Sequence, residues 1–228
     1  MNKKVQKRQV LQAKKIHKSF YHPTKISILD ELDLNVTSGE VVAIKGRSGE
    51  GKSTLLQILG TLDSPCKGEL RILDEPVTFF NKSKIRNHHL GFIFQSFHLL
   101  DDYTALENVL MPAKIAREAT SKNSPAFKRA LALLEQMGLL DRAHFSTKLL
   151  SGGEKQRVSI ARALCNDPDI IFADEPSGNL DKETASIIHD LLISFAKKQN
   201  KSLIVVTHDE SLVALADTQY LLQNKALV

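Results

Sequence analysis

The chain has 228 residues, of which 42% are hydrophobic and 25% charged, and it carries a net charge of +5. These proportions are typical of a globular domain. No apolar run approaches the roughly 18 residues that suggest a membrane span, and no N-terminal segment resembles a secretory signal. The two cysteines, Cys66 and Cys165, have no metal-ligand spacing, so we expect both to be buried apolar residues in a reducing compartment.

Much of the positive charge lies near the N-terminus, at Lys3, Lys4, Lys7, Arg8, Lys14, Lys15 and Lys18. Such an arm can attract nucleic acid or an anionic membrane face, and it can equally be a solvated terminus. The charge alone does not decide between these readings.

Apolar periodicity predicts the elements in chain order. The strand-like segments are 10–20, 28–36, 41–44, 68–73, 90–94, 170–173 and 203–206. Helical spacing is found over 51–62, over most of 105–163 with a polar break at 119–125, and over 182–198. Strands that alternate with helices indicate an α/β fold with a parallel sheet covered on both faces. The helical stretch indicates an inserted subdomain, about 96–160, within a core formed by about 1–95 and 160–228.

A glycine-rich segment follows the predicted strand 41–44 and opens the helix 51–62. It fits the phosphate-binding loop G-x-x-x-x-G-K-[ST], with the residues Gly46, Arg47, Ser48, Gly49, Glu50, Gly51, Lys52, Ser53 and then Thr54. The glycines let the backbone approach phosphates, and the helix directs its positive end toward the same anion. Lys52 is expected to neutralise the β and γ phosphates and Ser53 to bind Mg²⁺. Glu50 is unusual here, because a carboxylate near phosphates is unfavourable unless it points to solvent.

Paired carboxylates end a second apolar strand, where Ile170–Ala173 is followed by Asp174 and Glu175. Burying such acids is costly without a partner, and Mg²⁺ would supply one. Further along, Leu150-Ser151-Gly152-Gly153-Glu154-Lys155-Gln156-Arg157 opens a helix whose amides form an anion site. No phosphate loop lies nearby in the sequence.

The phosphate loop and the LSGGEKQR segment together resemble the ATP-binding-cassette (ABC) family over essentially the whole chain. The resemblance implies a mixed sheet core with an antiparallel β subdomain and an inserted α-helical subdomain. It implies that Asp174 orients the metal, that Glu175 is the general base, and that Gln95 senses Mg²⁺ and the attacking water. His208 resembles the switch histidine that bonds the γ-phosphate.

The same resemblance implies a head-to-tail dimer of two copies, with ATP held by the loop of one and by Ser151, Gly152 and Gly153 of the other. The segment Ser177–Asp181 resembles the D-loop that crosses this interface, with Asp181 near the nucleotide. Phe20 stands where the family stacks an aromatic ring on adenine, and Tyr21 is the alternative.

One more segment, Leu90–Leu100 followed by Tyr103–Val109 and Met111-Pro112, is similar to the lipoprotein-releasing (LolD-type) ATPases of Gram-negative bacteria. We therefore expect an ATPase that works with membrane permease subunits on the cytoplasmic face of the inner membrane, with no nucleic-acid partner. The alternatives are a macrolide or peptide exporter, an FtsE-type division ATPase, and a soluble non-transport ABC protein.

Overall fold

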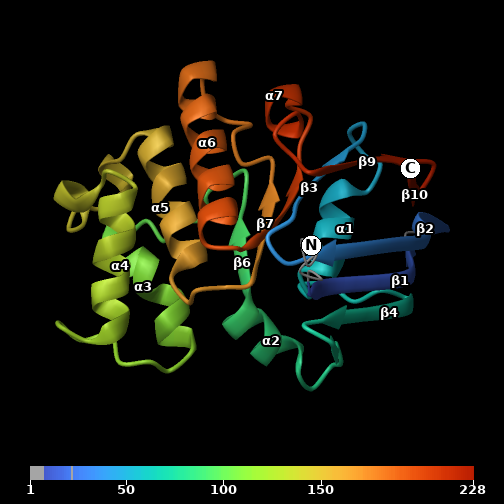
Figure 1. Ribbon diagram of the computed structural model, residues 1–228, viewed down its shortest axis with the longest axis horizontal. Coiled ribbons are helices and arrows are strands. Elements are labelled where there is room, and N and C mark those ends of the chain that lie inside the picture. The colour runs from blue at the N-terminus through green and yellow to red at the C-terminus, as the bar shows by residue number, and fades with distance from the viewer. Residues whose placement is uncertain (1–7, 22) are drawn as a thin grey trace, which may run out of the picture. The chain divides into compact units, whose positions relative to one another are not determined.

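The computed structural model describes residues 8–21 and 23–228 (Figure 1). The first three lysines of the basic arm lie outside these residues. The chain divides into two compact units. The first consists of Met1–Ser83 and Ile193–Val228, and the second of Lys84–Leu192.

An antiparallel sheet forms one part of the first unit. Its strands are β1 (Gln9–Tyr21), β2 (Lys25–Thr37), β4 (Lys67–Ile72) and β5 (Glu75–Pro76), in the order β2-β1-β4-β5. All neighbours pair antiparallel. Apolar side chains that alternate along β1 and β2 are buried, which stabilises these elements through the hydrophobic effect. The strands expected near 10–20 and 28–36 and the antiparallel β subdomain are confirmed.

The other part of the first unit is built around β3 (Val41–Lys45). This strand pairs in parallel with both β8 (Ser202–Val206) and β9 (Thr218–Gln223), and β10 (Ala226–Leu227) pairs antiparallel with β9. Helix α1 (Lys52–Leu59) follows β3 and buries its apolar face. The sequence had not predicted β9, β10 or the short helix α7 (Glu210–Val213).

In the second unit, β6 (Leu90–Ile93) and β7 (Ile170–Asp174) form a parallel pair. Three helices, α3 (Ala105–Ile115), α4 (Pro125–Gln136) and α5 (Gly152–Leu164), pack together around Leu106, Val109, Leu134 and Val158. Two short 3₁₀ turns, Leu140–Arg142 and Thr147–Leu149, lie between α4 and α5. The predicted helical run and its polar break are thus confirmed. Two helices cross the unit boundaries along the chain, α2 (Lys82–His89) and α6 (Lys182–Lys198). The sequence predicts α6 but not α2.

The two cysteines differ in environment. Cys165 is buried, and this burial raises its pKa to about 11. Cys66 is exposed, so the expectation that both are buried is wrong for this residue. Cys66 lies in the connection that leads into β4, outside the core, and its thiol donates to the Ser19 carbonyl at 3.6 Å. Within residues 8–21 and 23–228, no helix combines the length and the apolar character needed to cross a membrane.

Candidate functional site

The phosphate-loop segment joins β3 to α1 in the first unit. Gly51 immediately precedes α1, and no side-chain hydrogen bond caps the helix there. The φ angle of Gly51 is +96°, and a Cβ at this position would lie 2.4 Å from the Ile28 Cγ2 atom. Only glycine fits such a backbone without displacing β2. The first amides of α1 therefore lack a side-chain cap, and this end of the helix suits an anion.

Two charged side chains of this segment bond to its own backbone. Lys52 Nζ donates to the carbonyl oxygens of Gly46 (2.7 Å) and Arg47 (3.0 Å). Glu50 Oε2 accepts a hydrogen bond from the Arg47 amide at 2.8 Å. The Glu50 carboxylate thus engages the loop rather than pointing only to solvent, so it competes with a phosphate for one amide of the loop.

His208 lies close to the same edge of the first unit. It follows β8 after Thr207, and the Thr207 amide donates to the Ile44 carbonyl of β3 at 3.3 Å. Because β3 and β8 run parallel, the phosphate loop and His208 both follow the carboxyl ends of paired strands. Phe20 and Tyr21, at the end of β1, are 44% and 74% exposed, and Lys18 Nζ lies 5.0 Å from the centroid of the Phe20 ring. Both rings therefore remain candidates for stacking on a base.

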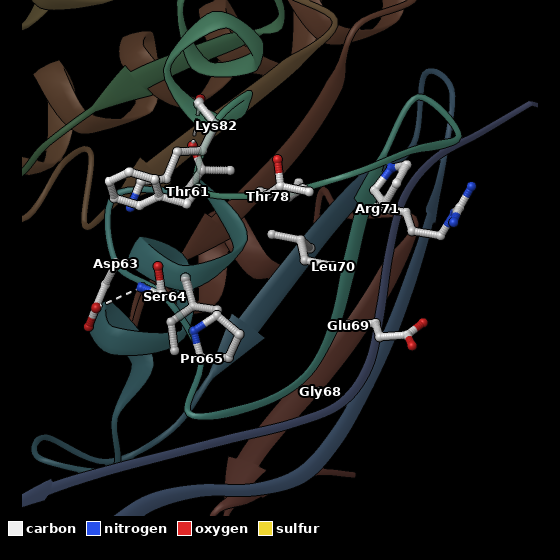
Figure 2. Close-up of a pocket in the computed structure, with 14 residues that line it drawn as sticks. Thr61, Asp63, Ser64, Pro65, Gly68, Glu69, Leu70, Arg71, Thr78 and Lys82 are labelled. Carbon is white, nitrogen blue, oxygen red and sulfur yellow. Dashed lines mark hydrogen bonds between the residues drawn. The ribbon is translucent and has the colours of Figure 1, made fainter.

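A separate pocket of about 410 Å³ lies in the first unit beside the C-terminal end of α1 (Figure 2). Its lining includes Leu70, Pro76 and Lys82, and none of the predicted site residues belongs to it. On its wall, burial alone would raise the pKa of Asp63, but the Lys18 ammonium at 2.7 Å and the Ser64 amide lower it. This pocket is therefore distinct from the phosphate loop.

In the second unit, two of the predicted catalytic residues, Gln95 and Glu175, follow the carboxyl ends of β6 and β7. The two strands pair from Leu90↔Ile170 to Ile93↔Ala173, so Gln95 and Asp174 emerge at one edge. Glu175 has a φ angle of +45°, an uncommon conformation for a residue other than glycine, and its carbonyl accepts from the Gly178 amide at 3.0 Å. A Cβ on Gly178 would lie 3.0 Å from Gln95 Nε2, so the Gln95 amide lies against this turn.

The signature segment begins α5 with a complete capping box. Ser151 Oγ accepts from the Glu154 amide at 3.3 Å, and Glu154 Oε2 accepts from the Ser151 amide at 2.8 Å. This bond from the Ser151 amide lowers the pKa of Glu154, and Arg142 Nε at 3.5 Å contributes. The Ser151 side chain also hydrogen-bonds the Glu154 carboxylate, so its hydroxyl would exchange that acceptor to donate to a phosphate oxygen.

The D-loop segment lies against this helix terminus. Cβ atoms added to Gly152 and Gly153 would lie 3.7 Å from Leu180 Cδ2 and 2.7 Å from Thr184 Cγ2. The carboxylate oxygens of Asp181 accept from the Thr184 amide (3.0 Å) and the Thr184 hydroxyl (2.8 Å). These bonds lower the pKa of Asp181. Asp181 therefore stabilises the start of α6, and its contact with nucleotide stays a prediction.

Sequence reasoning missed several buried or bridging residues that hold these segments. Gln156 is fully buried and donates to the Pro176 carbonyl at 2.6 Å, which joins α5 to the turn after Glu175. His189 of α6 lies 2.8 Å from Ser177 Oγ through Nε2. Asn179 Nδ2 donates to the Gln95 carbonyl at 2.8 Å. Nothing local in the sequence signals these long-range partners, although Gln156 and Asn179 stand inside the quoted motifs.

Comparison with known proteins agrees with this geometry. The family model for ABC transporters matches residues 29–178. A protein of Protochlamydia amoebophila named lipoprotein-releasing system ATP-binding protein LolD is 59% identical over 218 residues, with 96% of each chain covered. A LolD of Cytophaga hutchinsonii is 44% identical and covers 96% of this chain and 99% of its own.

Among solved structures, the dimeric ATP-binding cassette MJ0796 in a post-hydrolysis state with ADP and Pi superposes with a TM-score of 0.87. It is 38% identical, with 95% of this chain and 96% of that chain covered. The matching architecture confirms the predicted ABC cassette fold, with its mixed and antiparallel sheets and its helices. The chain therefore belongs to the ABC transporter family and is an ATP-hydrolysing member of it.

Proposed function

We propose that this chain is the ATP-hydrolysing subunit of a lipoprotein-releasing ABC transporter, peripheral on the cytoplasmic face of the inner membrane. The observation that carries the ATPase part is the start of α1, which has no side-chain cap and follows the glycine-rich segment. The lipoprotein part is supported by relatives at 59% and 44% identity that carry the LolD name.

Binding of ATP is assigned to the phosphate loop. The amides of Gly46–Ser53 and the start of α1 would surround the β and γ phosphates. Lys52 now donates to two loop carbonyls, so its ammonium already lies beside this segment and needs only a change of partner to reach a phosphate. Phe20, or alternatively Tyr21, would stack on adenine through its exposed ring.

Hydrolysis is assigned to the residues after β7, β6 and β8. Glu175 would take a proton from the attacking water, Gln95 would orient that water, and His208 would bond the γ-phosphate. Phosphoryl transfer depends mainly on positioning and charge neutralisation, so the rigid strand ends suit these roles. The pairing of β6 with β7 fixes where the segments that carry Gln95 and Glu175 leave the sheet of the second unit.

The chemistry of the three predicted metal ligands would suit Mg²⁺. Ser53, Gln95 and Asp174 offer a hydroxyl, an amide oxygen and a carboxylate, which are the oxygen ligands that this hard cation prefers. Mg²⁺ would neutralise charge on the phosphate oxygens. Ser53, at the start of α1, and Asp174, at the end of β7, would be ligands of the ion.

The signature segment explains why two copies are needed. Ser151, Gly152 and Gly153 form the start of α5, which suits a γ-phosphate, and the Ser151 hydroxyl would exchange the Glu154 carboxylate for a phosphate oxygen as its acceptor. ATP between this helix start of one copy and the phosphate loop of another would join the two copies head to tail, and hydrolysis would release them. The dimeric MJ0796 cassettes support such an arrangement.

Depletion of the protein in its own host tests the assignment. Lipoproteins destined for the outer membrane should accumulate in the inner membrane, which fractionation and immunoblotting would detect. Co-purification from native membranes should recover integral permease subunits. Normal lipoprotein sorting with a defect only in efflux or septation would refute lipoprotein release and favour the exporter or division reading.

A further inference from the structure

The loop that follows β6, Gln95–His98, is held by two side chains from distant parts of the second unit. Asn179 Nδ2 donates to the Gln95 carbonyl at 2.8 Å. The guanidinium of Arg162 donates through Nη2 to the Phe97 carbonyl at 2.7 Å and through Nη1 to the His98 carbonyl. Three of the loop's carbonyl groups are thus bound by side chains that lie 64 to 84 positions away in the sequence.

The loop needs such support because its backbone is unusual. Phe97 and His98 have φ angles of +51° and +49°, which residues other than glycine rarely adopt, least of all two in succession. The planar guanidinium presents two parallel donors and matches two neighbouring carbonyls better than a lysine ammonium would. Arg162 is half-buried, and this burial lowers its pKa, so its bonds to the loop lie in a partly desolvated environment that strengthens them.

Both holding side chains come from segments assigned to the dimer interface. Arg162 lies in the last turn of α5, the helix that the signature residue Ser151 caps. At 1.5 Å per residue, it lies about 16 Å along the axis from that cap. Asn179 belongs to the segment Ser177–Asp181, which packs against Gly152 through Leu180. Helix α5 therefore contacts the Ser177–Asp181 segment at its signature end and binds the Gln95–His98 loop from its last turn, through Arg162. Asn179 of that segment binds the same loop at the Gln95 carbonyl.

We propose that Arg162 and Asn179 are positioning residues that make the Gln95–His98 loop move as one body with the signature helix. Nucleotide engaged at Ser151 would then set the position of Gln95 through α5 without any change within the loop. Where the membrane subunits contact the segment after Gln95, the same link would carry the state of the dimer interface to them. That last step rests on the proposed function, whereas the link itself does not.

Hydrogen exchange of the full-length protein tests the link directly. In Arg162→Gln, amides of residues 96–100 should exchange at least tenfold faster, while amides in α3 and α4 keep their rates. Arg162→Lys should restore part of the protection, because one ammonium group can replace only part of the two-donor guanidinium. Asn179→Ala should accelerate exchange near Gln95 and Ser96. Arg129→Gln is the matched control, because Arg129 likewise donates to a backbone carbonyl, that of Cys165 at 2.9 Å, but does not bond to the loop.

Kinetics supply the second readout. Arg162→Gln should lower kcat for ATP about tenfold and leave KM within twofold, because the phosphate loop is untouched. In a Glu175→Gln background, ATP-driven dimerisation should also stay within twofold, since the Ser151 capping box does not involve Arg162. Arg129→Gln should leave both quantities near the parent values.

Three outcomes would overturn the proposal. Unchanged amide exchange at residues 96–100 in Arg162→Gln would show that the loop keeps its conformation without Arg162. Equal acceleration across α3, α4 and α5 would show that Arg162 only stabilises the fold. A raised KM with unchanged kcat would show that the loop does not position Gln95 for hydrolysis. If the parent protein instead fails to recruit membrane subunits, the proposed function fails while the exchange and kinetic results still decide the link.

Discussion

Replacing Asn108 should destabilise the protein more than its small size suggests. This residue of α3 is fully buried, and its amide fixes the loop that leads into the helix. Asn108 Oδ1 accepts from the Leu100 amide at 2.7 Å. Its Nδ2 donates to the Leu100 carbonyl at 3.1 Å and to the Thr104 carbonyl at 3.0 Å. Asn108→Ala removes all three bonds and leaves a backbone amide without this partner.

The expected loss follows from these bonds. At about 0.5–1.5 kcal/mol net per hydrogen bond, three bonds amount to roughly 1.5–4.5 kcal/mol. Alanine has a better helix propensity than asparagine, which offsets about 0.5 kcal/mol of this loss in the free energy of unfolding. Thr147 Oγ1 also donates to the Leu100 carbonyl at 3.1 Å, so that oxygen keeps one partner. We therefore expect the free energy of unfolding to fall by about 2–3 kcal/mol.

Urea unfolding at equilibrium measures this loss as a shift in midpoint at constant slope. Asn166→Ala is the matched control, because Asn166 makes one such bond, to the Asn87 carbonyl at 3.0 Å. It should cost no more than about 1 kcal/mol. If Asn108→Ala falls within about 0.5 kcal/mol of the parent, or matches Asn166→Ala, the argument that this amide fixes the loop is refuted.

Four further predictions concern the nucleotide machinery. Glu175→Gln should bind ATP normally but lose about 10²–10⁴-fold in turnover, as expected for a missing general base, and an ATPase rate within twofold of the parent would contradict this role. In that background, Ser151→Arg should still bind nucleotide but should not form the ATP-driven dimer, which light scattering would detect, and equal dimer fractions would refute the trans contact. Glu50→Ala should tighten ATP binding by about tenfold in titration calorimetry. The phosphate would no longer have to break the bond from the Arg47 amide to the Glu50 carboxylate, which costs about 1.5–3 kcal/mol. Weaker binding would show that Glu50 supports the loop. Because the pKa of Glu154 is lowered in the folded protein, its carboxylate stabilises the fold above the ordinary glutamate pKa of about 4.3, and this stabilisation is lost as the pH falls through the pKa of the folded state. The free energy of unfolding of Glu154→Gln should therefore fall less steeply with acid than that of the parent.

The parts of the fold with strong local signals could be predicted. Val41–Ile44 and Ile170–Ala173 are continuous apolar runs, and both are fully buried strands. The missed elements lack such a pattern. Strand β9 buries only Leu222, and α2 buries only Ile85, so neither shows an apolar period. Their positions are set by pairing with distant segments, as β9 pairs with β3, rather than by their own composition.

The same distinction applies to the candidate site. The loop and strand-end residues stand in motifs whose spacing reflects backbone geometry, so they could be proposed from the sequence. The contacts that hold these residues could not be predicted from the sequence. A side chain that bonds to a distant backbone carbonyl places no requirement on the residue type of the acceptor. Arg162 and Phe97 are 65 positions apart, and any residue at 97 offers the same carbonyl.

The Tyr103–Val109 segment, which is similar to the lipoprotein-releasing group in sequence, also holds its own backbone through side-chain bonds. Thr104 caps α3, and Glu107 completes the capping box through bonds of 2.8 and 2.9 Å to the Thr104 amide and hydroxyl. Asn108 fixes Leu100. Together with Arg162 and Asn179, these residues bind the backbone at several points between Gln95 and Thr104. Asn108 is fully buried, so its amide is costly unless its backbone partners stay in place, which gives this connection conformational specificity. The connection after Gln95 is therefore held by hydrogen bonds at several points of its backbone, which is what the proposed transmission from the nucleotide to a membrane subunit requires.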